Sequence, residues 1–235
     1  DLIGCAGITE PNAGSNSASL ATRAELDGDE YVLNGTKTWI SNATVADMVM
    51  ALCVTDKSKG PLGISRILVE KATSPYETNE LHKLGWYCFP TGEIFFEDCR
   101  VPRNQLVTTD PGSGYKRQMQ ASETARTGMC IMAAGMSQAA IDASIAYVRE
   151  RHQFGRPIAE FQAIKHKLAD IKIFIEAARS LCYRIAWCKD QGRPLNHLEA
   201  AIAKLFVGDW SLGPANDAVV IHGGYGYCHE YDVER

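Results

Sequence analysis

The chain has 235 residues, of which 46% are hydrophobic and 22% charged, and its formal net charge is −4 at pH 7. This composition is ordinary for a globular protein with one large domain or two smaller ones. No stripe of basic residues is present to neutralise phosphates, so nucleic-acid binding is not expected. No apolar run approaches the roughly 18–20 residues that a membrane span needs, so no membrane-spanning segment is expected.

The cysteines are informative about the compartment of the protein, and the first residues about how the chain begins. None of the eight cysteines forms a C-x-x-C pair, and several lie in apolar stretches such as MALCVT. We expect reduced, buried thiols in a reducing compartment, and no metal site. The start DLIGCAGITEPNAGS lacks an initiator Met and the regions of a signal peptide, so we expect a piece of a longer protein.

Residues 1–112 predict β-structure. Short strand-like runs surround Asp27-Gly28 and Asn34-Gly35, and both dipeptides are typical of tight hairpin turns. Three further runs, DMVMALCVT, ISRILVE and EIFFEDCRV, are separated by Gly, Pro and Ser. Several short strands without a long helix predict a β-sandwich or barrel.

Residues 113–235 change to a helical period, with apolar residues every three or four positions from Ile164 to Ile185. Long helices with short loops predict an antiparallel bundle, and the whole chain is therefore expected to be α+β. Pro214 interrupts the last helix, so we expect a kink or break near Leu212. The expected helices cover about residues 114–150, 159–190 and 195–221.

Two stretches of the β part hold residue types that bind ligands. GITEPNAGSN has small residues that let a ligand approach the backbone, and Thr9 and Ser15 add hydroxyl groups. In TWISNA, Trp39 could pack on a flat ring and Ser41 could donate to a ring nitrogen or carbonyl. A plain surface loop and a core Trp are the respective alternatives.

The helical part holds three further candidates. Arg126 follows SETA in an apolar neighbourhood, where its charge needs a partner such as Glu123 or a ligand. Arg151 could complement a helix dipole or reach a phosphate. Gly223 and Gly224 end a helix and permit close approach of a ligand, but their spacing is not that of a dinucleotide-binding fingerprint.

Together, five collinear stretches resemble signatures of the acyl-CoA dehydrogenase family: ITEPNAGSN, LNGTKTWISNA, FFEDCRVP, ERHQFGRPIAEFQAIKHKLAD and GGYGYCHEYDVER. The resemblance covers essentially the whole chain. It implies a middle β domain over 1–112 and an incomplete helical-bundle domain over 113–235. It also implies FAD-dependent α,β-dehydrogenation of an acyl-CoA, an electron-transferring flavoprotein as acceptor, a homotetramer, and a bacterial cytoplasmic or mitochondrial matrix location.

The resemblance assigns roles to cofactor-binding residues. Thr9 and Ser41 would hydrogen-bond the isoalloxazine ring of FAD, and Trp39 would pack against it. The residues that would serve the FAD of a neighbouring subunit are Arg151, Gln153, Phe154, Gly223 and Gly224.

The resemblance also implies substrate and partner contacts. Ser15 would lie near the pantetheine arm or the pyrophosphate, and Arg126 would lie by the CoA moiety with Glu123 nearby. Glu97 could meet the electron-transferring flavoprotein, with a solvated acid as the alternative.

The catalytic base stays unassigned. The usual Glu of the family lies downstream of the last glycine motif, beyond Arg235, and the position that a subgroup uses is Ala125 here. Glu230 belongs to the EYDVER signature and is expected to be structural. An acyl-CoA oxidase or flavin monooxygenase relative, and an inactive flavin-binding scaffold, are the alternatives that remain open.

Other departures from the family pattern leave the substrate open. Val220 stands where many members carry a Gln, and His222 replaces a common apolar residue. Trp86, Tyr87 and Phe89 could alter the shape near the substrate or serve core packing. A weak similarity points to a glutaryl-CoA-like or cyclic-acyl-CoA-like branch, while the acyl chain itself stays open.

Overall fold

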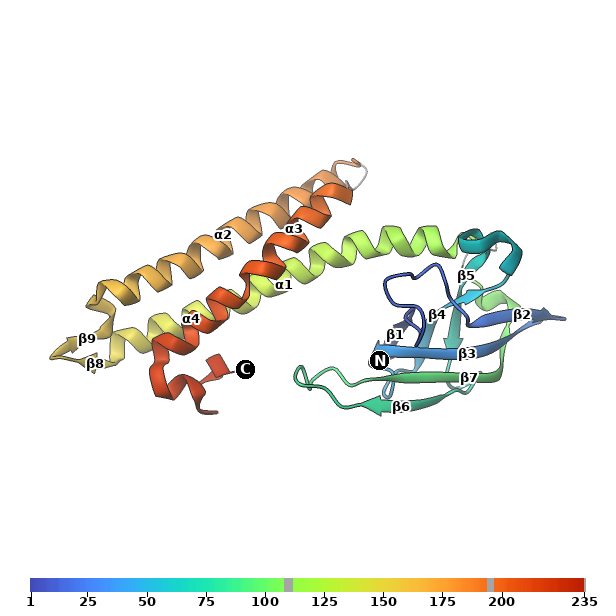
Figure 1. Ribbon diagram of the computed structural model, residues 1–235, viewed down its shortest axis with the longest axis horizontal. Helices are drawn as coiled ribbons and strands as arrows, with labels where there is room; N and C mark the ends of the chain where they lie inside the picture. Colours follow the sequence, from blue (N-terminus) through green and yellow to red (C-terminus); the bar gives the residue numbers. More distant parts are fainter. Residues whose placement is uncertain (108–111, 194–196, 235) are drawn as a thin grey trace. The chain divides into compact units, whose positions relative to one another are not determined.

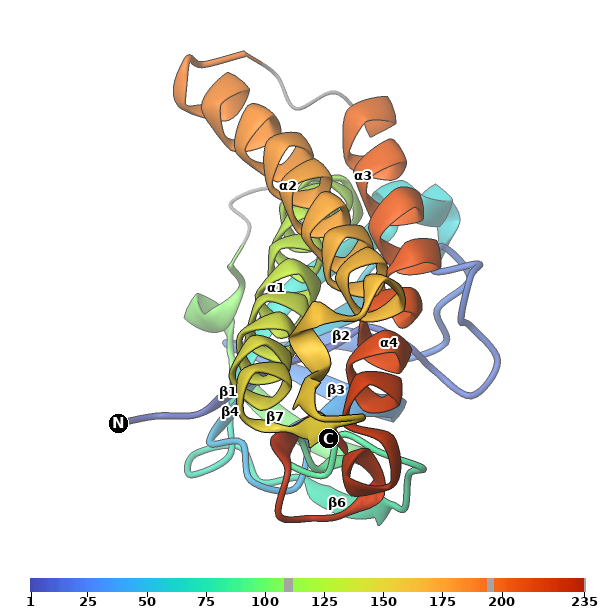
Figure 2. The ribbon, with the colours of Figure 1, turned by 90° about the vertical axis from the view of Figure 1, so that its left-hand side faces the viewer.

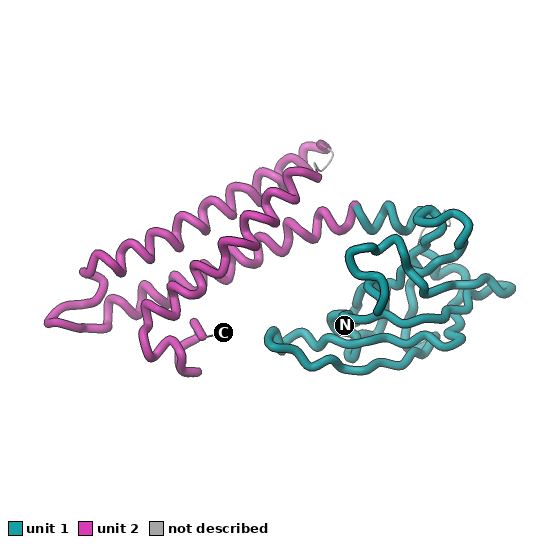
Figure 3. The backbone as a smooth tube through the Cα atoms, viewed as in Figure 1, with its two compact units in different colours: residues 1–119 teal, residues 120–235 magenta. Residues whose placement is uncertain are grey.

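The computed structural model describes residues 1–107, 112–193 and 197–234. The chain divides into two compact units, Asp1–Met119 and Gln120–Arg235 (Figure 3). Strands dominate the first unit and helices the second (Figure 1), so the expected order of a β domain followed by helices is confirmed.

The first unit is built on a curled mixed sheet, to which seven strands contribute within the described residues (Figure 1). Its path is β1-β4-β2-β3-β7-β6, with β5 paired to β4 outside that path. β1 runs parallel to β4, whereas β2–β3, β3–β7, β4–β5 and β6–β7 are antiparallel. The strands are β1 Gly4–Gly7, β2 Arg23–Asp27, β3 Glu30–Ser41, β4 Met48–Val54, β5 Ile64–Glu70, β6 Glu77–Leu81 and β7 Thr91–Pro102. Short 3₁₀ helices cover Lys57–Gly63 and Arg103–Gln105.

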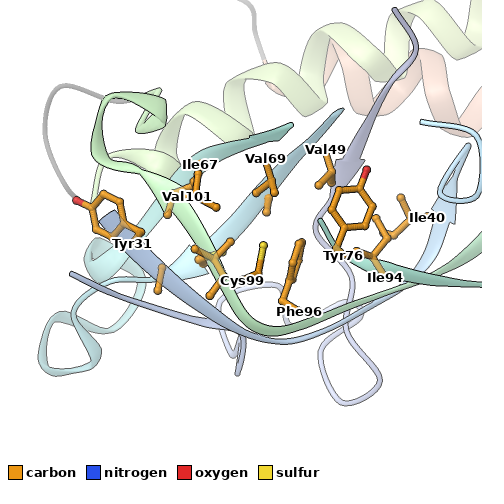
Figure 4. Close-up of a cluster of buried hydrophobic side chains, with 14 of the residues drawn as sticks. Tyr31, Ile40, Val49, Ile67, Val69, Tyr76, Ile94, Phe96, Cys99 and Val101 are labelled. Carbon is orange, nitrogen blue, oxygen red and sulfur yellow. The ribbon is translucent and has the colours of Figure 1, made fainter. Parts of the chain in front are cut away.

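One face of the curled sheet holds the core of this unit. Apolar side chains from β3, β4, β5 and β7 point toward one another there, among them Val49, Ile67 and Ile94, which are fully buried (Figure 4). Burying each such side chain stabilises the fold by roughly 1.5–3 kcal/mol. The alternation of buried and exposed positions along β7 follows from the period of two of a strand.

The two predicted hairpin turns have different outcomes. Gly28, with φ 61°, lies in the β2–β3 turn as expected. The expected turn at Asn34-Gly35 is wrong, because both residues lie inside β3, where the register with β7 shifts. Asn34 exchanges two hydrogen bonds of 3.0 Å with Asp98 across this bulge. Gly35 supplies the φ of 146° that the bulge requires.

The second unit contains the expected long helices. They are α1 Gly114–Glu150, which begins in the first unit, α2 Gln162–Asp190, α3 His197–Trp210 and α4 Leu212–His222. A short hairpin of β8 His152–Gln153 and β9 Arg156–Pro157 connects α1 to α2. Short 3₁₀ helices cover Ile158–Glu160, Gly223–Tyr227 and Asp232–Glu234.

Side chains from all four helices meet in one apolar cluster, which contains Cys130, Ile175, Val207 and Ile221. Figure 2 shows α2 beside α3 and α4, as their contacts also indicate. The predicted break near Leu212 is confirmed, since α3 ends at Trp210 and α4 begins at Leu212. Pro214 then lies in the first turn of α4, where the missing N–H costs little. The expected start of the third helix at residue 195 lies outside the described residues.

Helix α1 differs from the sequence-based expectation in one respect. By length and composition it could cross a membrane, with a mean hydropathy of 1.3 over an 18-residue window. Small and weakly polar residues produce this average without the uninterrupted apolar run that a membrane span would show. Core helices of soluble proteins can have the same length and composition.

Candidate cofactor and substrate site

The segment around Thr9 lies against strand β3. The amide of Thr38 donates a hydrogen bond of 2.9 Å to the carbonyl of Thr9. The following loop is closed by two backbone hydrogen bonds of 3.1 Å between Glu10 and Ala13. Ala13 is buried, whereas Ser15 lies at the exposed end of the loop. The loop is therefore anchored at its base and accessible at its end.

Strand β3 carries a second bulge beside this segment. Lys37 pairs with Ile94 and Ile40 with Gly92, so that two residues of β3 oppose one residue of β7. Trp39 lies at the bulge with φ 60°, a conformation in which a bulky side chain is an outlier. Strain of this kind often accompanies function.

The bulge decides which side chains face outward. Trp39 is 64% exposed and Ser41 is exposed, whereas Ile40 between them is 3% exposed. The alternative of a core Trp at position 39 is therefore wrong. An exposed indole next to an exposed hydroxyl can contact a flat aromatic ligand from one side.

A buried ion pair lies next to the bulge, and the sequence motifs did not reveal it. Lys37 Nζ is 2.7 Å from Glu10 Oε1, and it also donates to the carbonyls of Leu52 at 2.6 Å and Ile8 at 3.3 Å. The exposed fraction of the Lys37 side chain is 0% and that of Glu10 is 4%. A polar residue at an inward-facing strand position is the signal that could have revealed the pair, because a buried charge requires a partner.

Burial is the largest influence on the pKa of Glu10 and acts to raise it. The charge of Lys37 and hydrogen bonds from Lys37, Thr22 and Ala21 outweigh burial, so the pKa of Glu10 is lowered from its ordinary value of 4.5. The backbone amides of Ala21 and Thr22 reach the carboxylate at 2.6 and 3.0 Å. Glu10 is therefore ionised at neutral pH.

The candidates on α1, Arg126 and Glu123, do not form the salt bridge that was one of the alternatives for Arg126. Glu123 lies 2.9 Å from Nδ1 of His197 on α3 rather than pairing with Arg126. Arg126 is half-buried, and among the described residues no carboxylate pairs with it. Its guanidinium is thus free to bind an anionic or carbonyl ligand. The neighbouring Ala125 is exposed and cannot accept a proton.

A cavity of about 420 Å³ in the second unit gathers most of the remaining candidates. Arg151, Gln153, Gly223 and Gly224 all line it. A Cβ at either glycine would meet no atom within 4 Å, so both glycines leave room for a ligand. The structure therefore brings together two segments about 70 residues apart.

Phe154 does not line this cavity. It lies with Gly155 at the end of the β8–β9 hairpin, where both residues have positive φ, as type I′ turns require. The Phe154 side chain is 91% exposed. Its ring makes an edge contact with that of Phe161, at 6.1 Å between centroids, and most of its surface stays accessible to a partner that approaches the hairpin from outside.

Aromatic rings hold the cavity in shape, and among them Tyr147 is the one that the sequence motifs did not single out. The guanidinium of Arg151 lies 5.6 Å from the ring centroid of Tyr225. The ring of His222, 3% exposed, stacks on Tyr147 at 4.3 Å and bonds through Nδ1 to the carbonyl of Ala218 at 2.8 Å. His222 thus acts as a wall of the cavity, while Val220 is exposed.

The connection between β6 and β7 exposes three aromatic side chains. Trp86, Tyr87 and Phe89 are 54%, 78% and 41% exposed. Core packing, one of the two interpretations of these residues, is therefore wrong. Glu97 on β7 is also exposed, as both of its interpretations require.

Comparison with known proteins identifies the family. Residues 5–99 match the family model described as the acyl-CoA dehydrogenase middle domain, and residues 112–235 match the model of the acyl-CoA dehydrogenase C-terminal domain. The chain belongs to the acyl-CoA dehydrogenase family. The resemblance carried by the five motifs is thereby confirmed, and so is the acyl-CoA dehydrogenase-like fold.

Several relatives in this family match nearly the whole chain. The probable acyl-CoA dehydrogenase YngJ of Bacillus subtilis is 44% identical over 99% of this chain and 61% of its own length. The glutaryl-CoA dehydrogenase of Desulfococcus multivorans is 40% identical over 100% of this chain and 60% of its own length. A solved chain from the work on the electron transferring flavoprotein of Acidaminococcus fermentans superposes with a TM-score of 0.94 at 40% identity, over 100% of this chain and 61% of its own. The chain therefore spans about three fifths of the length of these relatives.

Proposed function

We propose that the full-length protein is an FAD-dependent acyl-CoA dehydrogenase that removes hydrogen from the α and β carbons of an acyl-CoA thioester. The observation that carries the proposal is the bulge in β3, which exposes Trp39 and Ser41 beside the Thr9 segment in a chain of this family. The bound FAD would supply the hydride acceptor for this reaction. The chain's own residues would bind and orient the two reactants.

The exposed wall of the first unit fits a flat, polar-edged ring. Trp39 would pack on the ring, because its indole is exposed and held in one backbone conformation by the bulge. Ser41 and Thr9 would hydrogen-bond the ring edge with their hydroxyl groups. Strand β3 holds Trp39 and Ser41 more rigidly than a free loop would, and the Thr38–Thr9 hydrogen bond ties Thr9 to the same strand, which favours preorganised binding.

The cavity of the second unit would take an anionic part of a cofactor held mainly by another subunit. Arg151, oriented by the ring of Tyr225, would supply the positive charge. Gln153, Gly223 and Gly224 would add polar groups and open space, and Phe154 would contact the cofactor from the hairpin. The charge and the glycines support this assignment.

A homo-oligomer, here proposed as a tetramer, would bring the cofactor of another subunit within reach of this cavity. Apolar side chains of the second unit that are more than 45% exposed recur at helical spacing along α3 and into α4. Unburied apolar stripes of this kind support a contact between subunits. They are Leu198 (62%), Ile202 (47%), Leu205 (66%) and Leu212 (68%).

Each unit holds a residue proposed to bind part of the CoA thioester: Arg126 on α1 in the second unit, and Ser15 in the loop after Thr9 in the first. The unpaired guanidinium of Arg126 supports a role in binding the CoA moiety, with Glu123 nearby and Ser15 toward the pantetheine arm or the pyrophosphate. The base that takes the α-proton stays unassigned, because Ala125 cannot accept a proton. The length of the acyl chain stays open.

Electrons would leave to an electron-transferring flavoprotein. The exposed Glu97 and the adjacent Asp98 on β7 would present negative charge to that partner. The solved relative from the work on an electron transferring flavoprotein supports this choice of acceptor.

Anaerobic reduction of the purified full-length protein tests the proposal. Mixing with a panel of acyl-CoAs should bleach the visible absorbance of the flavin for at least one substrate and yield the enoyl-CoA by mass spectrometry. Air should then reoxidise the flavin slowly, whereas electron-transferring flavoprotein should do so quickly. Fast reoxidation with peroxide would instead identify an oxidase, and a colourless protein that takes up no FAD would refute the proposal.

A pair of tryptophan variants tests the flavin wall itself. Trp39→Leu should weaken FAD binding on the order of tenfold, because one stacking surface is lost. Trp187→Leu is the matched control, since Trp187 is similarly exposed at 53% but lies on α2. Equal FAD affinities of the two variants would contradict the assignment of Trp39.

A further inference from the structure

The Lys37–Glu10 pair uses every hydrogen-bonding group it has. The ammonium of Lys37 has three N–H bonds and meets three oxygens, those of Glu10, Leu52 and Ile8. Both carboxylate oxygens of Glu10 accept, one from Ala21 and the other from Lys37 and Thr22. The ammonium and both carboxylate oxygens thus have partners within the protein, and both side chains are buried.

Stability alone is a poor explanation for such a pair. Removing two charges from water costs several kcal/mol each, and apolar residues of similar volume often stabilise a core as well or better. The geometric effect is more specific, because the pair ties three segments together. It joins the Ile8–Glu10 segment to β3 through Lys37 and to β4 through Leu52.

The joined segments are those that carry the proposed flavin contacts. Thr9 lies between Ile8 and Glu10, which both bind the ammonium, and its carbonyl accepts from the amide of Thr38. Lys37 is also the last residue of β3 in register with β7 before the bulge that exposes Trp39. The pair therefore holds both sides of the wall at the point where they meet.

We infer that Lys37 and Glu10 are a positioning pair for the flavin: they hold the Thr9 segment against the bulge of β3, so that Thr9, Trp39 and Ser41 present one fixed surface to the ring. This inference rests on the proposed function for the ligand. The geometric part does not need the cofactor, because the pair and the Thr38–Thr9 hydrogen bond are both formed in the protein itself.

Three variants of the full-length protein separate positioning from stability. Lys37→Met removes the donor to all three oxygens while keeping much of the side-chain volume. Glu10→Gln keeps an acceptor for Lys37 and serves as the mild variant if Lys37→Met does not fold. The double variant Lys37→Met with Glu10→Gln removes both charges, and so relieves the unpaired carboxylate that Lys37→Met leaves.

A core variant at the far end of the same strand pair is the matched control. Val101, fully buried on β7, pairs with Tyr31 of β3. Tyr31 lies six residues from Lys37, about 20 Å along the strand at roughly 3.3 Å per residue. Val101→Ala destabilises the same core without touching the pair.

Three readouts are measured on each variant: hydrogen exchange of the Thr38 amide in the cofactor-free protein, resistance to urea, and the dissociation constant of FAD. Lys37→Met should speed the exchange and weaken FAD binding by about tenfold or more, the equivalent of one charge-assisted hydrogen bond. Val101→Ala should change FAD binding by no more than about twofold. The double variant should regain resistance to urea, while its Thr38 exchange and FAD affinity should stay at the level of Lys37→Met.

Recovery of FAD affinity together with stability in the double variant would overturn the inference, because the pair would then act through stability alone. An unchanged FAD affinity of Lys37→Met, beside a wild type that binds FAD, would overturn it as well and leave the proposed function intact. A wild type that takes up no FAD would instead overturn the proposed function, and the inference with it.

Discussion

Gly35 lies within β3 at a position where any side chain should be costly. Its φ is 146°, and a Cβ built there would lie 2.6 Å from Thr22 Cα and 2.5 Å from Thr22 Oγ1. Thr22 is held in place on both sides, since its amide donates to Glu10 and its carbonyl accepts from Val54 at 2.8 Å. The neighbouring backbone therefore has little freedom to yield to a side chain.

The expected cost of Gly35→Ala has two parts. A residue other than glycine in this region of φ costs about 1–3 kcal/mol. Forcing a methyl group into a packed site costs about 1–3 kcal/mol more. The sum of about 2–6 kcal/mol is a large share of the roughly 5–15 kcal/mol that stabilises a typical domain.

Urea unfolding of Gly35→Ala and Gly28→Ala measures the steric part by difference. Gly28 also has a positive φ, of 61°, but no atom lies within 4 Å of the position that a methyl group would take there. Gly28→Ala should cost only about 1–2 kcal/mol, the ordinary penalty of a left-handed conformation. Equal losses of unfolding free energy in the two variants would refute the argument that the bulge is closed against Thr22.

Three further outcomes are expected. The pKa of Glu10 is lowered from 4.5 in the folded protein, so the ionised carboxylate stabilises the fold above that pH, and this stabilisation is lost as the pH falls through the lowered pKa. Urea unfolding between about pH 3 and pH 7 should therefore show a smaller loss of stability at acid pH in Glu10→Gln than in the wild type. Arg151→Met should weaken FAD binding about tenfold, whereas Arg149→Met, in the last turn of α1 and outside the cavity, should leave it unchanged in the same titration. Arg126→Met should raise the dissociation constant of an acyl-CoA about tenfold with FAD content unaltered; an effect on FAD content instead would place Arg126 with the cofactor.

Local sequence signals were sufficient to predict the elements that depend on interactions between residues close together in the chain. The helical period from Ile164 to Ile185 predicts α2, and Pro214 predicts the break between α3 and α4. Asp27-Gly28 predicts the β2–β3 turn, because both strands that it joins are next to it in the chain. The motifs also identified the family, since their residue types and order do not depend on knowing the fold.

Contacts between segments far apart in the chain decided features that the local sequence signals did not specify. Asn34-Gly35 has the composition of a hairpin turn, but a positive φ serves a bulge equally well, and Asp98, 64 residues away, pairs with Asn34 across it. The partner of Lys37 is Glu10, 27 residues earlier, and no local pattern specifies that distance.

The cavity beside Gly223 also depends on segments that are far apart in the chain. Local sequence determines backbone preference and burial period, because both act within a turn or a strand. Which segments meet depends on how the whole sheet curls and how the helices pack, and these arrangements place Trp39 in solvent and bring Arg151 to the glycines.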